Sequence, residues 1–304
     1  MPWYEEFDRK VREYLPDLAL RQEEPMREHC SFRVGGPARR MAFPGTGEQL
    51  VILLQLAEDC GARPLVLGKG SNILPPDGGM DRLVIETSRL AALEAGEDGT
   101  ILAEAGVPLA RLAEFAAQRG LAGLAFAHGI PGTVGGALCM NAGAYGGEMK
   151  DVVEEVTLLL PEGVQRFSGA EMAFGYRHSF LSEHPEAVAI RARFRLTTGD
   201  ESAIRERMRE LMGKRRASQP LEYPSAGSTF KRPQGHFAAA LIDQCGLKGL
   251  TVGGAQVSEK HAGFVINRGG ATAADILALI QEVQRRVLAE KGVMLQPEVK
   301  LLDA

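Results

Sequence analysis

The stretch "GIPGTVGGALCMNAGAYGG", residues 129–147, places seven glycines within nineteen positions. Glycines in such numbers mark backbone that adopts unusual conformations or approaches a ligand closely. The stretch lacks the Gly-Lys-Ser/Thr ending of a P-loop, and it is not the G-x-G-x-x-G that opens a dinucleotide-binding βαβ unit. Its small residues still allow backbone N–H groups to converge on a diphosphate, and we favour that interpretation over tight turns alone.

A second glycine loop, "LGKGSN" at 67–72, follows directly after a predicted strand. Tight turns explain this shorter loop as well as a phosphate contact does. Both loops combine glycine with small polar residues, so their backbones can approach a pyrophosphate without obstruction by side chains. Together they predict a site for a phosphate-containing ligand.

The segments around these loops predict a chain of mixed helices and strands. A helix at 272–291 has Thr272 as its cap, an apolar stripe of Ile276, Leu279, Ile280, Val283 and Val287, and Gly292 as its stop. Pro108 opens a second helix, at 108–119, and Gly120 ends it. The other predicted elements are helices at 45–61 and from 201, strands at 63–68, 82–87 and 100–106, and antiparallel strands at 154–161 and 187–199.

The composition is that of a globular chain of 304 residues, with 45% hydrophobic and 24% charged residues and room for two or three domains. A net charge of −4 provides no basic field for nucleic acid. No apolar run of membrane-spanning length and no signal peptide are found. The four cysteines and six histidines lack the spacing of a metal site or a disulfide framework, so we expect free thiols in the cytoplasm.

Three motifs in order carry a family resemblance: "SFRVGGPA" (31–38), "LGKGSNIL" (67–74) and the glycine stretch at 129–148. They resemble the FAD-binding signatures of the vanillyl-alcohol-oxidase (PCMH-type) fold, and most closely those of the UDP-N-acetylenolpyruvoylglucosamine reductase family, in its shorter type II subtype. The resemblance spans about residues 20–302. It implies an α+β chain with FAD-binding subdomains at 1–88 and 89–200. A C-terminal α+β substrate-binding domain follows at 201–304, and its tail from about 295 returns to the active site.

The resemblance also implies which residues bind FAD. Pro37 stands where some members of the wider fold carry a histidine bonded to the flavin, and proline has no nucleophilic atom, so we expect FAD to be noncovalent. The implied cofactor-binding residues are Arg33, Gly35, Gly68, Lys69, Gly70, Ser71, Asn72, Gly129, Ile130, Pro131, Gly132, Gly135, Gly136, Asn141, Ala142 and Gly143.

Three later motifs carry the family's catalytic positions. "FGYRHSF" (174–180) contains Arg177, "AGSTFKRP" (226–233) contains Ser228 and "QPEVK" (296–300) contains Glu298. The implied reaction uses NADPH to reduce an enolpyruvyl ether to a lactyl ether. Arg177 stabilises negative charge, Glu298 donates a hydrogen bond and Ser228 protonates the α-carbon. Ser228 does not match the G-x-S-x-G motif of a nucleophile.

The implied substrate is UDP-N-acetylglucosamine enolpyruvate, with NADPH as co-substrate and no nucleic-acid or membrane partner, and we expect a monomer. Candidate substrate contacts are Arg215, Gln219, Tyr223, Lys231 and Arg232. Family members often have asparagine where Arg232 stands, which leaves the detailed role of that position open. Two alternatives remain: another flavin oxidoreductase of this fold, such as an oxidase of small alcohols, and a noncatalytic nucleotide-sugar-binding protein.

Overall fold

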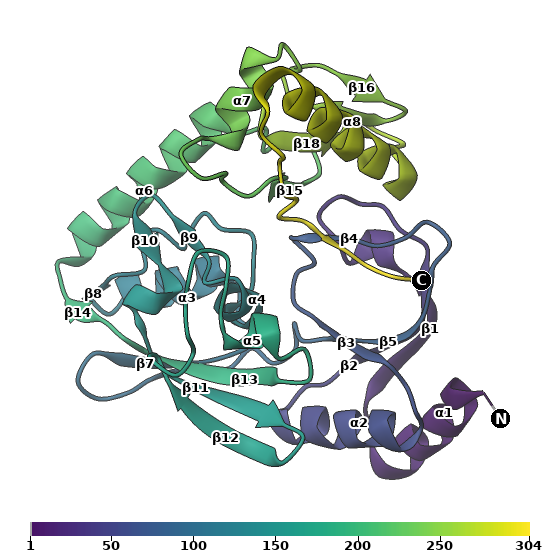
Figure 1. Ribbon diagram of the computed structural model, residues 1–304. Coiled ribbons are helices and arrows are strands. Elements are labelled where there is room, and N and C mark those ends of the chain that lie inside the picture. Colours follow the sequence, from purple (N-terminus) through teal and green to yellow (C-terminus); the bar gives the residue numbers. More distant parts are fainter. Residues whose placement is uncertain (1) are drawn as a thin grey trace. The chain divides into compact units, whose positions relative to one another are not determined.

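A computed structural model describes residues 2–304, and the chain divides into two compact units. Unit 1 contains the chain up to Arg21, Met41–Lys69 and Leu83–Lys214. Unit 2 contains Gln22–Arg40, Gly70–Arg82 and Arg215–Ala304. The chain therefore enters unit 2 twice before residues Arg215–Ala304 complete that unit. The colours in Figure 1 run from purple to yellow along the sequence and allow this path to be traced.

Eight α-helices and nineteen strands are assigned within residues 2–304. The helices are α1 (Trp3–Tyr14), α2 (Gly47–Asp59), α3 (Leu109–Ala117), α4 (Val134–Cys139), α5 (Phe180–Glu183), α6 (Glu201–Ser218), α7 (Ala238–Gln244) and α8 (Ala273–Lys291), with short 3-10 turns at Met26–Glu28 and Met149–Asp151. The strands are β1 (Ala19–Pro25), β2 (Pro37–Phe43), β3 (Pro64–Leu67), β4 (Ile73–Leu74), β5 (Met80–Glu86), β6 (Leu93–Ala95), β7 (Thr100–Glu104), β8 (Leu121–Ala122), β9 (Gly143–Ala144), β10 (Gly147–Glu148), β11 (Val153–Leu160), β12 (Gly163–Ser168), β13 (Val188–Arg195), β14 (Thr197–Thr198), β15 (Ser225–Ser228), β16 (Thr251–Val252), β17 (Ala255–Val257), β18 (Phe264–Asn267) and β19 (Lys300–Leu301).

Unit 1 is built on an antiparallel sheet of five strands in the order β12-β11-β13-β7-β6. This confirms the antiparallel arrangement predicted for 154–161 and 187–199. A core that includes Ile101, Leu109, Leu112, Val134 and Phe194 is almost fully buried and contains both α3 and α4. Because α4 lies in the glycine stretch, this core holds the loop that is predicted to bind a phosphate-containing ligand.

A second sheet, in the order β1-β2-β5-β3, contains the predicted strands at 63–68 and 82–87. β3 runs parallel to β5, with Leu65 opposite Val84. Strands β1, β2 and β5 each begin in one unit and end in the other. Local hydrophobic patterning predicts that such segments are strands, but it does not predict this partition.

The predicted helices are confirmed, although α2 and α3 are each shorter at both ends than the predicted ranges 45–61 and 108–119. Thr46 caps α2, and Thr272 caps α8 by accepting a hydrogen bond from the Asp275 N–H at 3.0 Å. Gly292 ends α8 in a left-handed conformation, and the predicted apolar stripe is buried. Pro108, predicted as a first-turn residue, is the N-cap of α3 instead, because its backbone is extended at ψ 136°.

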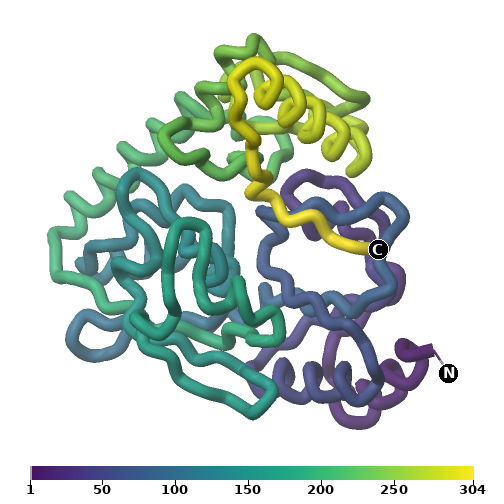
Figure 2. Tube along the Cα trace, viewed as in Figure 1, coloured from purple at the N-terminus to yellow at the C-terminus, as the bar shows by residue number. Residues whose placement is uncertain are grey.

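Unit 2 combines an antiparallel sheet, in the order β15-β18-β17-β16, with α7 and α8. The carboxylate of Asp77 accepts hydrogen bonds from the N–H groups of Ala273 and Ala274, so the loop after β4 binds the start of α8. The C-terminal strand β19 pairs in parallel with β4, and Figure 2 shows the yellow C-terminal segment that contains it. The tail thus lies next to the residues that follow the "LGKGSN" loop.

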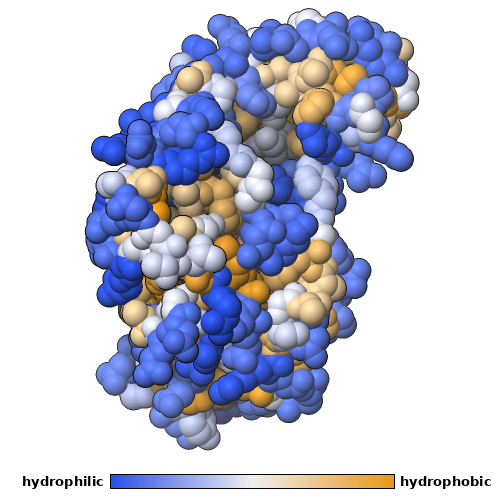
Figure 3. All heavy atoms as spheres, turned by 90° about the vertical axis from the view of Figure 1, so that its left-hand side faces the viewer, coloured by the Kyte–Doolittle hydropathy of each residue, from blue (hydrophilic) through white to orange (hydrophobic). Residues whose placement is uncertain are grey.

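The long helix α6 is mostly exposed, and its buried residues are Ile204, Met208 and Leu211. Figure 3 views the molecule from the side where α6 lies in Figure 1, and that face is mainly hydrophilic. Among residues 2–304, no helix combines the length and apolar character needed to span a membrane.

Candidate active site

The two predicted phosphate-binding loops meet within unit 1, at Gly68 and Thr133. A Cβ atom at Gly68 would overlap the hydroxyl oxygen of Thr133 and force that side chain to move, so glycine allows the two loops to approach as they do. Thr133 is buried, and its hydroxyl oxygen has no hydrogen-bond partner within the described chain. A buried hydroxyl without a partner is costly, and a ligand is one way to satisfy it. A close approach beside an orphaned polar atom fits a diphosphate group held between the loops.

The protein itself uses several of the amides in the long loop. The N–H groups of Val134 and Gly135 donate to the carbonyls of Val107 and Ala105, at 2.9 and 2.8 Å. The Gly132 N–H likewise donates to Ile130. These three N–H groups therefore hold the loop against neighbouring backbone and are already engaged in hydrogen bonds within the protein.

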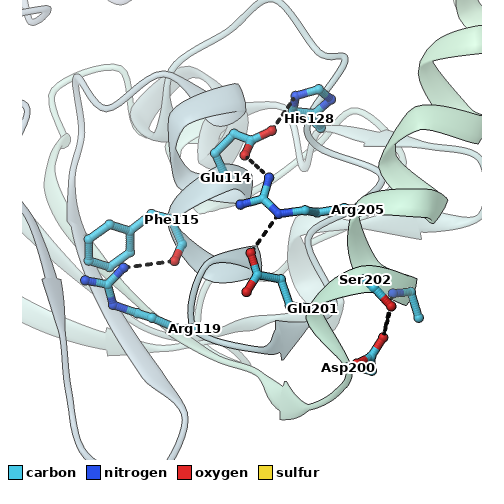
Figure 4. A network of polar contacts seen from close by, with 9 residues as sticks. Glu114, Phe115, Arg119, His128, Asp200, Glu201, Ser202 and Arg205 are labelled. Carbon is cyan, nitrogen blue, oxygen red and sulfur yellow. Dashed lines mark hydrogen bonds and ion pairs between the residues drawn. The ribbon is translucent and has the colours of Figure 1, made fainter.

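A polar network fixes the start of the long glycine loop (Figure 4). The carboxylate of Glu114, on α3, lies 3.3 Å from Nε2 of His128 and accepts a 2.8 Å hydrogen bond from Arg205 on α6. Arg205 also donates to Glu201, and its pKa is raised by these hydrogen bonds to Glu201 and Glu114. His128 directly precedes Gly129, so two helices hold the point where the loop begins.

We expect Gly68→Ala to release most of the flavin implied by the two loops. The added methyl group overlaps the Thr133 hydroxyl, and overpacking of this kind costs about 1–3 kcal/mol, which corresponds to a loss of affinity of roughly 5- to 150-fold. The measurement is the ratio of flavin to protein absorbance after gel filtration. Gly213→Ala is the matched control, because a Cβ in that exposed helical position meets no atom within 4 Å. A Gly68→Ala protein with full flavin content would contradict the assignment of this loop.

In unit 2, the remainder of the "LGKGSN" loop lies against the "SFRVGGPA" motif. Gly70 has φ 57°, and a Cβ there would overlap the carbonyl of His29. The Gly70 carbonyl accepts a hydrogen bond from the Ser31 N–H at 3.0 Å. Arg33 is exposed with φ 57°, and Gly35 also has positive φ. The first and second motifs predicted to bind FAD are therefore neighbours in unit 2, and Gly68 and Lys69 are grouped with unit 1.

Ser228 and Glu298 come together in unit 2 through backbone pairing. The Glu298 N–H donates to the Thr229 carbonyl at 2.8 Å, and the Lys231 N–H donates to Gln296 at 2.8 Å. Ser228 lies exposed at the end of β15, immediately before the paired segment. The side-chain amide of Asn72 donates to the Glu298 carbonyl at 3.1 Å. A predicted proton donor, a predicted acid and part of a flavin loop are thus gathered in one place.

Arg177 lies in unit 1 at the third position of a tight turn. Gly175 and His178 exchange two backbone hydrogen bonds, at 3.0 and 3.3 Å, across Tyr176 and Arg177. Arg177 has φ 54°, a left-handed conformation that costs a residue other than glycine on the order of 1 kcal/mol. Its guanidinium carbon lies 5.2 Å from the centre of the exposed Tyr176 ring. Strain of this kind persists only where neighbouring contacts enforce it.

Asn141, predicted to bind the cofactor, directs its side chain into the protein. Its amide donates to the Gly175 carbonyl at 3.0 Å and to the Glu148 carboxylate at 2.6 Å. Its carbonyl oxygen accepts a hydrogen bond from the Lys150 N–H at 3.0 Å. The residue is 1% exposed, and both ends of its side-chain amide are engaged by hydrogen bonds within the protein. Ala142 and Gly143 follow it, half-buried, into β9.

The remaining cofactor candidates are distributed over both units. Gly129 and Ile130 are half-buried and Pro131 and Gly136 are exposed, all in unit 1. Ser71, half-buried, belongs to unit 2.

All five predicted substrate contacts lie in unit 2. The Gln219 side-chain oxygen is buried and lacks a hydrogen-bond partner among residues 2–304, so it is able to accept one from a ligand. Arg268 lies over the Tyr223 ring at 5.2 Å, and Arg232 lies over the Phe237 ring at 3.9 Å. Lys231 is half-buried next to Gln296, and Arg215 is half-buried near the end of α6.

Sequence reasoning missed two residues that shape the site. Thr133 stands inside the glycine stretch, and its position between Gly132 and Gly135 is the signal that points to it. Thr229 is fully buried, and its hydroxyl oxygen accepts a hydrogen bond from the Val265 N–H at 3.0 Å, which fixes the strand end that carries Ser228. No motif distinguishes a threonine with that function from an ordinary strand residue.

Comparison with known families identifies two matching regions. The model described as UDP-N-acetylenolpyruvoylglucosamine reductase, C-terminal domain, matches residues 219–302, and the one described as FAD binding domain matches residues 38–168. The chain is 48% identical to the UDP-N-acetylenolpyruvoylglucosamine reductase of Agathobacter rectalis, over 97% of this chain and 98% of that protein. It is also 48% identical to the protein of the same name from Clostridioides difficile, over 93% of each.

Solved structures show the same similarity. The crystal structure of UDP-N-acetylenolpyruvylglucosamine reductase from Thermus caldophilus matches with a TM-score of 0.79 and 35% identity, covering 94% of this chain and 99% of that one. Alkyldihydroxyacetonephosphate synthase matches with a TM-score of 0.50 and 18% identity, over 64% of this chain and 40% of its own, and shares the fold alone. These matches confirm the α+β FAD-binding fold predicted from the sequence.

Proposed function

Because this chain belongs to the UDP-N-acetylenolpyruvoylglucosamine reductase family, we propose that it reduces UDP-N-acetylglucosamine enolpyruvate to UDP-N-acetylmuramate with NADPH, in the synthesis of peptidoglycan precursors. The relatives match over almost their whole length, so the proposal concerns the complete reaction and not one domain of it. The four free cysteines support a reducing, cytoplasmic setting.

FAD is the cofactor of this reaction. When bound, it takes a hydride from NADPH and supplies that hydride to the β-carbon of the enolpyruvyl group. The approach of Gly68 to the unpartnered Thr133 hydroxyl supports a diphosphate position between the two glycine loops. Pro37, at the start of β2, provides no atom for a covalent bond, so the cofactor is held by noncovalent contacts alone.

The arrangement of Ser228 beside Glu298 is the observation that carries this proposal. Addition at the β-carbon leaves an electron pair on the α-carbon, delocalised into the adjacent carboxylate, and a proton must reach the α-carbon from one face. An exposed serine hydroxyl at a strand end is free to meet a substrate, and backbone pairing with the Glu298 segment holds that strand end. Ser228 gives up the proton and Glu298 donates a hydrogen bond to the developing charge.

Arg177 supplies the positive charge in this scheme. A guanidinium presents donors in a planar fork that matches a carboxylate, and the substrate's carboxylate gains negative charge as the electron pair moves. The strained turn supports this function, because strained backbone conformations cluster at active sites, ligand clamps and switch regions. The basic side chains of Lys231 and Arg232 suit the substrate's diphosphate.

The test is anaerobic turnover of the purified protein with its native cofactor. We expect a flavin absorbance spectrum, bleaching by NADPH, and recovery on addition of UDP-N-acetylglucosamine enolpyruvate, with a product heavier by two hydrogen atoms. UDP-N-acetylglucosamine, which lacks the double bond, is the control and should leave the reduced flavin bleached. Rapid reoxidation by oxygen with no reoxidation by the enolpyruvyl substrate would indicate an oxidase, and a colourless protein would indicate a nucleotide-sugar-binding protein without this activity.

A further inference from the structure

We propose that Asn141 is a positioning residue for Arg177: its side-chain amide holds the 175–178 turn in the conformation that presents the guanidinium. This inference rests on the proposed function, because it concerns how Arg177 is placed for that reaction. It assigns to the Asn141 side chain a function different from a contact with the cofactor.

Asn141 contacts the turn directly, at the backbone carbonyl of Gly175, which also takes part in the hydrogen bonds that close the turn. The Gly175 carbonyl accepts two hydrogen bonds, one from the His178 N–H across the turn at 3.3 Å and one from the Asn141 amide at 3.0 Å. A carbonyl oxygen has two lone pairs, so both bonds form together. The 3.3 Å bond is the longer of the two, and the Asn141 bond fixes the same oxygen from outside the turn.

The turn requires such a restraint because of Arg177 itself. With φ 54°, Arg177 occupies a conformation that non-glycine residues avoid unless surrounding contacts enforce it. Asn141 is itself left-handed, at φ 41°, and asparagine tolerates this conformation better than most residues. The left-handed backbone position 141 is therefore occupied by a residue whose side-chain amide also donates two hydrogen bonds, to Gly175 and Glu148.

Asn141 is oriented by groups on its other sides. The second amide hydrogen points to the Glu148 carboxylate at 2.6 Å, and the Lys150 N–H fixes the carbonyl oxygen. Lys150 and Glu148 also form an ion pair, and their hydrogen bond raises the pKa of Lys150. These contacts define which end of the amide faces Gly175, because only the NH₂ end is able to donate to both acceptors.

The other side of the turn is tied to the same loop. The hydroxyl groups of Ser179 and Ser182 both donate to the Cys139 carbonyl, at 2.9 and 2.8 Å. The segment carrying Arg177 is thus attached to the glycine loop on both sides, at Asn141 and at Cys139. Of these two attachments to the glycine loop, the Asn141 contact is the one made to a residue of the turn itself.

The test compares Asn141→Asp with the native holoenzyme. Aspartate has the same shape but loses both amide donors, and it places a carboxylate next to Glu148 and the Gly175 carbonyl. We expect normal flavin content, normal flavin reduction by NADPH, and at least tenfold slower reoxidation by the enolpyruvyl substrate. Hydrogen exchange followed by mass spectrometry should show faster exchange in the peptide containing Gly175–His178, a readout independent of activity.

Two further variants complete the design. Gln165→Glu is the matched control, because it also replaces a side-chain amide by a carboxylate. The Gln165 amide donates to the Glu162 carboxylate at 3.1 Å, on an exposed strand of the same unit. Both the reoxidation rate and the hydrogen exchange should remain native in this variant. Asn141→Ser removes both amide donors without adding a charge, and it provides the same comparison if the aspartate variant does not fold.

The double variant Asn141→Asp/Arg177→Ala separates the possible results. If Asn141 acts through Arg177, the double variant is no slower than Arg177→Ala alone, because the positioned group is absent. If Arg177→Ala retains native rates, the proposed function of Arg177 is wrong and the inference fails with it. Two results would overturn the positioning inference alone, given that Arg177→Ala is slow. In the first, both Asn141 variants have native rates. In the second, both Asn141 variants lose flavin and are impaired in both half-reactions.

Discussion

Replacing Ser228 with alanine should leave flavin reduction by NADPH fast and slow reoxidation by the enolpyruvyl substrate about 10²–10⁴-fold, the usual contribution of a positioned acid. The reason is that Ser228 enters the reaction only at protonation of the α-carbon. The hydroxyl is exposed, whereas Thr229 next to it is buried and holds the strand end, so the substitution removes the donor and preserves its support. Anaerobic stopped-flow absorbance measures each half-reaction separately.

A control with the same change of side chain is Ser202→Ala, at a surface position on α6 where the hydroxyl donates only to Asp200. It should match the native enzyme in both half-reactions. If Ser228→Ala instead slows flavin reduction, or leaves reoxidation unchanged, Ser228 is not the proton donor.

Replacing Arg177 with alanine should lower the rate of flavin reoxidation by about 10²–10³-fold, the effect of removing one preorganised donor to developing charge. Arg177→Lys should recover only part of this, because an ammonium lacks the planar fork of a guanidinium. Arg166→Ala, which removes an exposed arginine on β12, is the control. Native turnover in Arg177→Ala would exclude the arginine from the reaction.

The left-handed backbone at Arg177 adds a stability measurement to this experiment. Arg177→Gly also removes the guanidinium, but glycine adopts φ 54° without strain. We therefore expect the glycine variant to unfold at a higher temperature than Arg177→Ala, although both are slow. This comparison separates the energetic cost of the turn from its contribution to the reaction.

Local patterns in the sequence predicted most of the individual elements. The α8 stripe of Ile276, Leu279 and Val283 has a strict helical period, and its cap and stop are residues whose effects act within one turn. Strands β11 and β13 are also predicted from a local pattern, the alternation of apolar and polar residues along a short segment. These features require no knowledge of any other segment.

The arrangement of the site could not be predicted in this way. Ser228 lies near Glu298 only because the chain at Thr229–Lys231 pairs with Gln296–Glu298, and such pairing between distant segments leaves no local pattern. The direction of the Asn141 side chain likewise depends on Gly175 and Glu148, which the glycine motif does not encode. The resemblance identified these residues as important without showing which atoms they contact.

The interleaved path of the chain has a consequence for its synthesis on the ribosome. Unit 1 has all its residues once Lys214 has emerged, whereas Gln22–Arg40 and Gly70–Arg82 belong to a unit that also needs Arg215–Ala304. Strand β19, at Lys300–Leu301, pairs with β4 in the second of these segments and is translated more than 200 residues after it. Until Arg215–Ala304 has been translated, these two segments lack most of the residues of their unit, so a product truncated before that point would leave part of unit 2 open to chaperones and proteases.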